Sequence, residues 1–400
     1  MKTIMALLRV TCLLVAALIV QGMKQEKVNM LMPEVAPQNP DTYMCIPLKM
    51  TDAYTYIVGF EPHADKRVAH HMLLYGCSEP GMSDTPVWNC GGMEHPSYKS
   101  ASTCSGGSRI IYAWAYDAPG LTLPKDVGFK VGGDTGINYL VLQVHYKDVS
   151  NFIPPKNGKD SSGVVLVTTD EPQPNRAGVM LLGTGGQISG HSVEYFETSC
   201  QYDENFPVYP FAYRTHAHEH GRVVSGYVIK DGQWTEIGRK DPRQPEMFYN
   251  VTTPGVSILP GNFMAARCSM VNDDDKTVYI GATHMDEMCN FYIMFYTPGD
   301  RTTAKTCWSA GPPSYYWDQG NDAKLIHPEN APKSVSVDPD TGKEYKITTR
   351  KAQPVVRDKL MEENVVDSVN QRMPNDEQAF ARLLRKLSAS YRQRYNDPLY

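Results

Sequence analysis

Side chains that could bind a metal ion are concentrated in three short stretches of this 400-residue sequence. The stretch around residue 216 carries two imidazoles two residues apart, His216 and His218. Residues two apart in a β-strand point to the same face, so both rings and Arg214 would share one face. His220 would join them if the strand continued. Two imidazoles on one face can hold a metal ion, and the alternative is a surface pair without a ligand.

The other histidines of interest are His70, His71 and His145. Adjacent residues of a regular strand face opposite sides, so His70 and His71 can bind one ion only where the backbone twists or bulges. His145 lies in an apolar run, residues 141–146, in which it shares a face with Gln143. Taken alone, His145 could equally be a hydrogen-bonded structural residue.

The third stretch, residues 288–294, reads Met-Cys-Asn-Phe-Tyr-Ile-Met. In a strand, Met288, Asn290 and Tyr292 would share one face, and Cys289 and Phe291 would share the other. A face of Met, Asn and Tyr is unusual for a core. A thioether is a soft ligand that suits copper in its reduced state, although any single methionine is more often a packing residue.

The composition indicates a globular β-protein that would position these residues. Charged residues make up 21%, apolar residues 41%, and the net charge of −5 gives no reason to expect nucleic-acid binding. Pro, Gly and Tyr are abundant, and short β-like runs alternate with turn signals across residues 41–310. We expect an all-β fold of two antiparallel, jelly-roll-like β-sandwich domains followed by an irregular, partly helical C-terminal tail.

The N-terminus and the cysteines indicate the secretory pathway. Lys2 and Arg9 precede a short apolar run, which is typical of a signal peptide over residues 1–22, with an uncleaved anchor as the alternative. No later apolar segment is long enough to cross a bilayer. Eight cysteines remain after Cys12 is removed, four before residue 105 and four after residue 199, which favours two separately cross-linked domains.

Proline and composition shifts mark the expected boundaries. Residues 23–40 would form a loose lead-in, residues 41–172 a first domain and residues 173–312 a second, with a Pro-Gln-Pro hinge at 172–174. Residues 313–400 would form the C-terminal extension, in which apolar residues recur at helical spacing between Phe380 and Tyr391. Asn250 begins an Asn-Val-Thr glycosylation sequon.

Seven segments together resemble the copper type II, ascorbate-dependent monooxygenases, and among them the enzymes that hydroxylate C-terminal glycine in peptides. They are AHHMLLYGC, LPKDVGFKVGGDTG, LVLQVHY, FAYRTHAH, VVSGYVIKDGQWTEIGR, AARC and DEMCNFYIMFY, which occur in the family order between residues 41 and 310. The resemblance implies two copper sites, one in each β-sandwich. His70, His71 and His145 would hold the electron-transfer copper, and His216, His218 and Met288 would hold the oxygen-binding copper.

The resemblance also implies roles for the neighbouring residues. Arg214, Asn290 and Tyr292 would bind the C-terminal carboxylate of the substrate, for which a guanidinium is well suited. Gln143 could order solvent or substrate between the sites, and His220 has no ligand role. The implied disulfides are Cys45–Cys90, Cys77–Cys104, Cys200–Cys307 and Cys268–Cys289. Some relatives have one further disulfide in the first domain, where this chain has Ser161 and Ser162.

From the resemblance we expect a monomeric, secreted or granule-resident monooxygenase that uses two copper ions, ascorbate and O2. It would hydroxylate the α-carbon of C-terminal glycine, the first step of peptide amidation. The stretch after residue 310 is too short for a lyase domain, so a lyase would be a separate polypeptide. The alternatives are a monooxygenase of small amines, of the tyramine or dopamine β-hydroxylase type, and a secreted copper-binding protein without enzyme activity.

Overall fold

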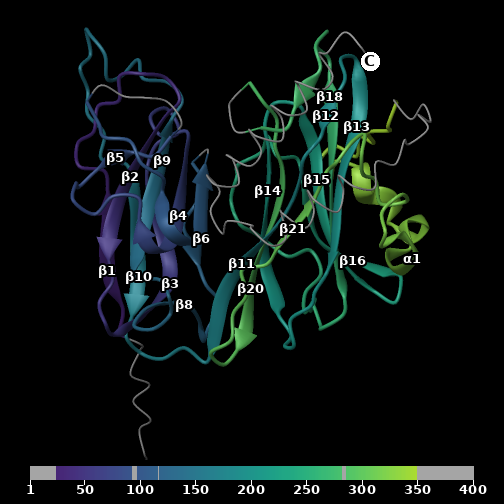
Figure 1. Ribbon diagram of the computed structural model, residues 1–400, viewed down its shortest axis with the longest axis horizontal. Helices are drawn as coiled ribbons and strands as arrows, with labels where there is room; N and C mark the ends of the chain where they lie inside the picture. Colours follow the sequence, from purple (N-terminus) through teal and green to yellow (C-terminus); the bar gives the residue numbers. More distant parts are fainter. Residues whose placement is uncertain (1–23, 92–96, 116, 282–284, 349–400) are drawn as a thin grey trace, which may run out of the picture.

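A computed structural model describes residues 24–91, 97–115, 117–281 and 285–348, which form two lobes of β-sheet lying side by side (Figure 1). The all-β class is confirmed. The described helices are short: α1 (Ala323–Ile326) and the 3-10 helices η1 (Pro328–Asn330) and η2 (Lys333–Ser336). No helix in these ranges is long and apolar enough to cross a membrane.

The first lobe is a sandwich of two sheets. One sheet has the order β5-β2-β9-β4-β6, and its strands are β5 (Trp88–Asn89), β2 (Thr42–Lys49), β9 (Tyr139–Tyr146), β4 (His71–Pro80) and β6 (Cys104–Ala115). The other sheet begins with β1 (Glu26–Leu31), β10 (Gly163–Thr169), β3 (Tyr54–His63) and β8 (Val127–Gly132), and β7 (Leu121–Thr122) pairs with β3. Side chains from both sheets form one buried apolar cluster.

The second lobe repeats this arrangement. Its inner sheet consists of β11 (Asn175–Thr184), β20 (Cys289–Pro298), β14 (Tyr209–Ala217) and β17 (Tyr249–Asn250), and β21 (Thr306–Ser309) pairs with β11. Its outer sheet consists of β13 (Ser192–Gln201), β18 (Phe263–Asn272), β15 (Gly221–Lys230) and β16 (Gln233–Lys240). A small separate ladder joins β12 (Gln187–Ile188) to β19 (Val278–Tyr279).

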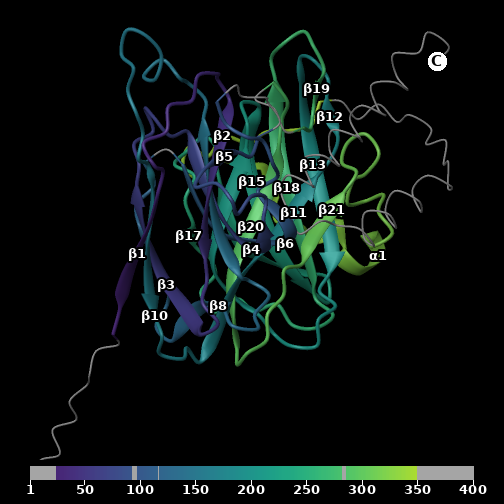
Figure 2. The same cartoon turned by 60° about the vertical axis from the view of Figure 1, so that its left-hand side comes forward.

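The lobes share one continuous sheet, because β8 of the first lobe pairs in parallel with β11 of the second through Val127–Asn175 and Gly128–Arg176. Lys130 Nζ lies 2.7 Å from Asp300 on the second lobe. The joined strands lie together at the lower end of the molecule in Figure 1 and remain together in the turned view of Figure 2. The lobes are therefore connected by hydrogen-bonded backbone as well as by the chain itself.

The N-terminal lead-in is more ordered than the sequence predicts. The lead-in is not loose, because residues 26–31 form β1, which pairs antiparallel with β10 and buries Met30. Its alternating pattern is short and polar, so the sequence alone gives a weak strand signal. The signal segment 1–22 and the apolar repeat at 380–391 lie outside the described residues.

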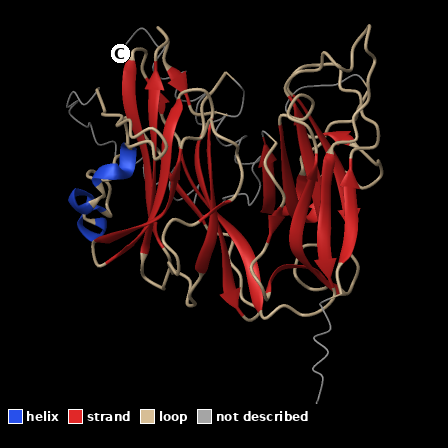
Figure 3. Ribbon diagram, turned by 180° about the vertical axis from the view of Figure 1, so that it is seen from behind, coloured by secondary structure: helices blue, strands red, loops and turns tan. Residues whose placement is uncertain are grey.

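The segment after β21 covers the outer sheet of the second lobe. Helix α1 lies on the side of the second lobe that is remote from the first (Figure 3). Trp317, Ile326 and Val335 from this segment are buried in a cluster with Tyr227 and Phe263 of the outer sheet. The described part of the C-terminal extension is therefore packed on the second sandwich.

Strands β14 and β20 have two differently used faces. Phe291 and Ile293 of β20 and Tyr213 of β14 belong to the core of the second lobe. Tyr292 belongs instead to the apolar cluster of the first lobe, so the opposite face of these strands meets that lobe. The alternation expected for residues 288–294 accounts for this division.

Two glycines of the outer sheet leave room for the aromatic core of the second lobe. Gly226 and Gly238 are register partners on β15 and β16. A Cβ added to Gly226 would lie 2.1 Å from the ring of Phe291, and one added to Gly238 would lie 2.2 Å from Tyr213. The two rings are stacked with centroids 5.6 Å apart. The position of β14 and β20 thus depends on the space beside Gly226 and Gly238, which a larger residue would fill.

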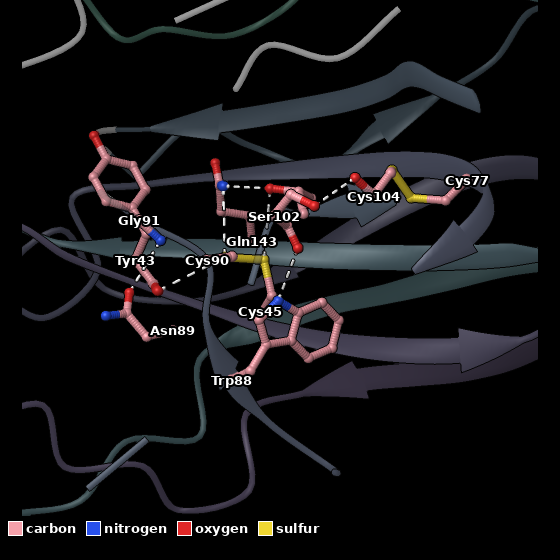
Figure 4. The surroundings of a disulfide bond; sticks show 11 residues. Tyr43, Cys45, Cys77, Trp88, Asn89, Cys90, Gly91, Ser102, Cys104 and Gln143 are labelled. Atoms are coloured by element: carbon pink, nitrogen blue, oxygen red, sulfur yellow. Dashed lines mark hydrogen bonds between the residues drawn. A yellow bond between two sulfur atoms is a disulfide. The ribbon is translucent and has the colours of Figure 1, made fainter. Parts of the chain in front are cut away.

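The four disulfides join the pairs implied by the resemblance, two in each lobe. Figure 4 shows Gln143 beside Cys45–Cys90. The Gln143 amide donates to Thr103 Oγ1 at 2.9 Å and is buried. This bond holds Gln143 in the interior of the first lobe, so the structure does not support its expected role in ordering solvent or substrate between the two sites.

Replacing Gly226 with Ala should destabilise the protein by about 1–3 kcal/mol, because the new methyl group overlaps the Phe291 ring and overpacked cores lose stability by this amount. The free energy of unfolding from urea titration measures the effect. Lys230→Ala, at the exposed end of the same strand, is the control and should change it by less than about 0.5 kcal/mol. Equal stability of Gly226→Ala and wild type would contradict the packing described here.

Candidate metal centres

His70, His71 and His145 converge in the first lobe. His71 begins β4 and lies directly opposite His145 of β9. His70 precedes β4, outside the regular pleat, and its backbone amide donates to the His145 carbonyl at 2.9 Å. One ring nitrogen from each residue lies within 4.8 Å of the others. His70 and His71 can approach the same point because the regular strand begins only at His71, which leaves His70 outside the pleat.

The unsatisfied atoms of this cluster point to a metal ion. His145 Nδ1 is buried and has no hydrogen-bond partner among the described residues. The other nitrogen of His145, Nε2, lies 3.1 Å from Asp41 Oδ1, and the ring stacks on Tyr43 at 4.1 Å. The Nδ1 atoms of His70 and His71 are 3.2 Å apart. A buried lone pair without a donor is costly, and three imidazoles suit copper and other borderline metals.

Burial keeps these imidazoles uncharged. Burial and the neighbouring His145 lower the pKa of His70 to about 4. Burial also places the pKa of His71 well below its usual value, and it lowers the pKa of His145 against the opposing effect of Asp41. Neutral imidazoles at physiological pH are the form that binds a metal ion.

A second cluster lies at the end of β14. The rings of His216 and His218 have centroids 5.3 Å apart. His216 lies opposite Asn290, and Ala217 lies opposite Cys289, where the pairing ends. Met288 Sδ lies 3.9 Å from Asn290 Nδ2. Of the sequence-predicted ligands, His216 lies on β14, His218 follows directly after it, and Met288 directly precedes β20.

The hydrogen-bond partners of His216 and His218 determine which ring nitrogen remains available to bind a metal ion. His216 Nδ1 lies 2.9 Å from Glu246 Oε2, and His218 Nδ1 lies 2.8 Å from the Asp286 carbonyl. A histidine whose Nδ1–H donates to an oxygen presents an unprotonated Nε2. The first cluster would thus bind through Nδ1 in at least one residue, His145, and the second through Nε2. Two imidazoles and a thioether fit a copper site.

A buried glutamate, Glu287, shapes the turn that follows β14. Its carboxylate accepts the backbone amides of His218, of His220 at 2.8 Å and of Met288 at 2.7 Å. His220 Nδ1 lies 3.3 Å from the same carboxylate. Glu287 thus connects the backbone of the proposed ligands His218 and Met288. His220 contacts this carboxylate and is not one of the proposed ligands.

Arg214, Asn290 and Tyr292 share the face that meets the first lobe. Arg214 lies opposite Tyr292, and the guanidinium carbon is 5.1 Å from the Tyr292 ring centre. Asn290 Nδ2 lies 3.3 Å from the Tyr292 hydroxyl. Arg214 is buried and forms an ion pair with Glu246. Its Nε has no hydrogen-bond partner in the described part of the chain.

The two clusters influence each other across the lobe boundary. After burial, the charges of His145 and His70 lower the pKa of His71, and so does the charge of His216 in the second lobe. Burial lowers the pKa of His145, and His218 of the second lobe lowers it further. Protonation of a histidine in one cluster would therefore disfavour protonation in the other.

Sequence reasoning missed three acidic residues at these sites: Asp41, Glu246 and Glu287. Glu287 is adjacent to Met288, which is a weak signal. Asp41 and Glu246 lie 104 and 30 residues from the histidines that they contact, and nothing in their local sequence reveals the contact. Asn250, the sequon residue, is exposed on β17.

Comparison with known proteins identifies both lobes. Residues 28–152 match the family described as "Copper type II ascorbate-dependent monooxygenase, N-terminal domain", and residues 175–320 match the corresponding C-terminal domain. The histidines and Met288 of the two clusters lie within these ranges.

Curated relatives agree with these matches. A peptidylglycine alpha-amidating monooxygenase of Rattus norvegicus is 43% identical over 66% of this chain and 26% of its own length. Peptidyl-glycine alpha-amidating monooxygenase B of Xenopus laevis is 40% identical over 74% of this chain and 33% of its own length. The dopamine beta-hydroxylase of Equus caballus is 26% identical over 71% of this chain. The chain thus spans about a quarter to a third of the length of its amidating relatives.

The lowered pKa values in the first cluster predict a pH-dependent stability of the metal-free protein. Unfolded histidines have a pKa near 6.5, whereas burial lowers the pKa of His70 in the folded protein to about 4. Between these values the unfolded state binds more protons, so the free energy of unfolding should fall as the pH decreases. Urea titrations at a series of pH values across this window measure the fall.

A variant with His70→Gln and His71→Gln provides the comparison, because it lacks two of the titrating groups. Its free energy of unfolding should change less between pH 6.5 and 4 than that of the wild type. An identical change in both proteins would show that these imidazoles are not held in the neutral form.

Proposed function

The chain belongs to the copper type II ascorbate-dependent monooxygenase family, and we propose that it hydroxylates the α-carbon of a C-terminal glycine in peptides. Relatives named as peptidylglycine amidating enzymes are 40–43% identical to it, whereas dopamine and tyramine β-hydroxylases are 26–27% identical. The reaction would be the first step of C-terminal amidation. A small-amine monooxygenase is the second candidate.

Six side chains would hold two copper ions. His70, His71 and His145 form one set, supported by the buried and unsatisfied Nδ1 of His145. His216, His218 and Met288 form the other, supported by Nδ1 atoms that are already engaged and by a soft sulfur donor. When bound, the copper ions supply one-electron redox chemistry, with ascorbate as reductant and O2 as co-substrate.

One observation carries the choice of substrate: Arg214 and His216 are two residues apart on one strand, opposite Tyr292 and Asn290. A guanidinium can bind a carboxylate through two charge-assisted hydrogen bonds, and Arg214 Nε, which has no partner among the residues that the structure describes, is available for one. Asn290 and Tyr292 would provide further donors. A glycine carboxylate held by Arg214 would have its α-carbon one bond away, and the proposed ligand His216 is two residues along the same strand.

The remaining parts of the proposal concern organisation and location. We assign residues 41–172 and 173–312 to two copper-binding domains, with a signal peptide at 1–22, a lead-in at 23–40 and an extension at 313–400. Four disulfides fit the secretory pathway, and we place the protein in secretory granules or outside the cell. Asn250 would be glycosylated, and the protein would be monomeric.

The proposed activity can be tested with purified, copper-loaded protein and ascorbate. A peptide ending in glycine should be converted to its α-hydroxyglycine form with matching oxygen uptake, and tyramine should not. Mass spectrometry follows the product, and elemental analysis counts copper. Met288→Ala should lose turnover but keep the copper of the first cluster. Bound copper without ascorbate-dependent oxygen uptake would favour the non-enzymatic alternative, and preferential turnover of tyramine would favour the amine alternative.

Arg214→Ala should raise KM for the glycine-extended peptide by about ten- to a hundredfold, the effect of losing a charge-assisted hydrogen-bond pair. The value of kcat should change less, because the metal ligands stay in place. Arg301→Ala, at an exposed position just after the turn that follows β20, is the matched control and should leave KM unchanged. Unchanged KM in Arg214→Ala would remove this residue from the substrate site.

A further inference from the structure

Glu246 occupies a position between two residues of the proposed site. It lies on the connection between β16 and β17 and is 6% exposed. Its carboxylate forms an ion pair with Arg214 Nη2, and both of its oxygens lie within 3.0 Å of His216 Nδ1. One buried carboxylate therefore contacts the proposed carboxylate-binding residue and a proposed metal ligand.

The ion pair with Arg214 brings the carboxylate of Glu246 into the interior beside a guanidinium. The negative charge of Glu246 thus balances the positive charge of Arg214 inside the protein. A substrate carboxylate that reaches Arg214 meets a guanidinium whose charge is already neutralised.

The geometry of Arg214 shows how the guanidinium can be shared. Nε and Nη2 lie along one edge, which can hold a carboxylate through two parallel bonds. Glu246 takes Nη2 only, and Nε is buried without a partner among the described residues. An unmade hydrogen bond at a 3% exposed side chain is costly, so the open Nε marks where an oxygen of another molecule would be accepted.

We infer that Glu246 is a specificity-determining and positioning residue, which competes with the substrate carboxylate for Arg214 and orients His216 through Nδ1. This inference rests on the proposed function. The competition makes carboxylate binding weaker than the guanidinium alone would allow, and it favours release of the hydroxylated product, which keeps the same carboxylate. The contact with His216 fixes the tautomer that presents Nε2.

The two parts of the inference predict opposite effects of one substitution. Glu246→Gln keeps the shape of the side chain and removes the charge. Binding of a peptide carboxylate should become about tenfold tighter, because a like charge beside Arg214 is gone. Copper affinity at the second cluster should fall about tenfold or more, because His216 loses its carboxylate partner. If Glu246 had a purely structural role, the substitution would weaken both peptide binding and copper binding.

The binding experiment uses the full copper-loaded chain without ascorbate, so that no turnover occurs. Calorimetry compares an N-acetylated tripeptide ending in glycine with the same peptide as its carboxamide. In Glu246→Gln the Kd of the carboxylate peptide should fall and that of the carboxamide should not. Glu236→Gln is the matched control, because Glu236 pairs with Arg239 on the outer sheet and should change neither value.

Copper affinity is measured by competition with a chelator, and the occupancy of the second cluster is followed by the copper spectrum. If Glu246→Gln is too unstable for calorimetry, the rise of the unfolding midpoint on adding each peptide reports the same affinities. A larger rise than in the wild type with the carboxylate peptide alone supports the inference.

The outcomes separate this inference from the proposed function. If the wild type prefers the carboxylate peptide and Glu246→Gln does not bind it more tightly, the inference is wrong and the proposed function stands. Equal strengthening of both peptides also overturns the inference, since the effect would not depend on Arg214 competition. If the wild type does not distinguish the two peptides, the proposed substrate is wrong and the inference fails with it.

Discussion

The alternation of side chains along β14 and β20 is the constraint on which both the fold and the site depend. Tyr213, Phe291 and Ile293 fill the core of the second lobe, so their neighbours must face the first lobe. A shift of one residue in the pairing would bury Arg214 and His216 among aromatic rings and expose the rings instead. The site is therefore fixed by the packing of apolar residues that never touch a ligand.

Several features maintain that register. Cys289 is bonded to Cys268 on the outer sheet, directly beside the proposed ligand Met288. The hollow at Gly226 and Gly238 admits the rings of β14 and β20 in one position. Glu287 then ties the backbone of β20 to the end of β14 through three amide hydrogen bonds. Covalent, steric and polar contacts all act on the same pair of strands, which gives the ligands a rigid frame.

The sequence alone was sufficient to predict those strands and strand faces that depend on neighbouring residues. The strand at 139–146 begins and ends as expected, and the two faces of residues 288–294 follow from period two. The parallel pairing of β8 with β11 and the contacts of Asp41 and Glu246 were not foreseen. These depend on which distant segments come together, and the polar residues involved carry no periodic signal of their own. Strand β1 was missed for a related reason, since a short edge strand has few apolar positions.

The ion pair of Arg214 and Glu246 is hard to explain by stability. Removing two charges from water costs several kcal/mol for each, and well-packed apolar residues often replace such pairs without loss. Both side chains are buried, and Arg214 Nε has no hydrogen-bond partner within residues 24–91, 97–115, 117–281 and 285–348. Their neighbours on the same face, Tyr292 and Met294, show that apolar packing is available there. A costly, incompletely satisfied pair next to imidazoles whose Nδ1 atoms already have oxygen partners is the arrangement expected where chemistry rather than folding sets the residue types.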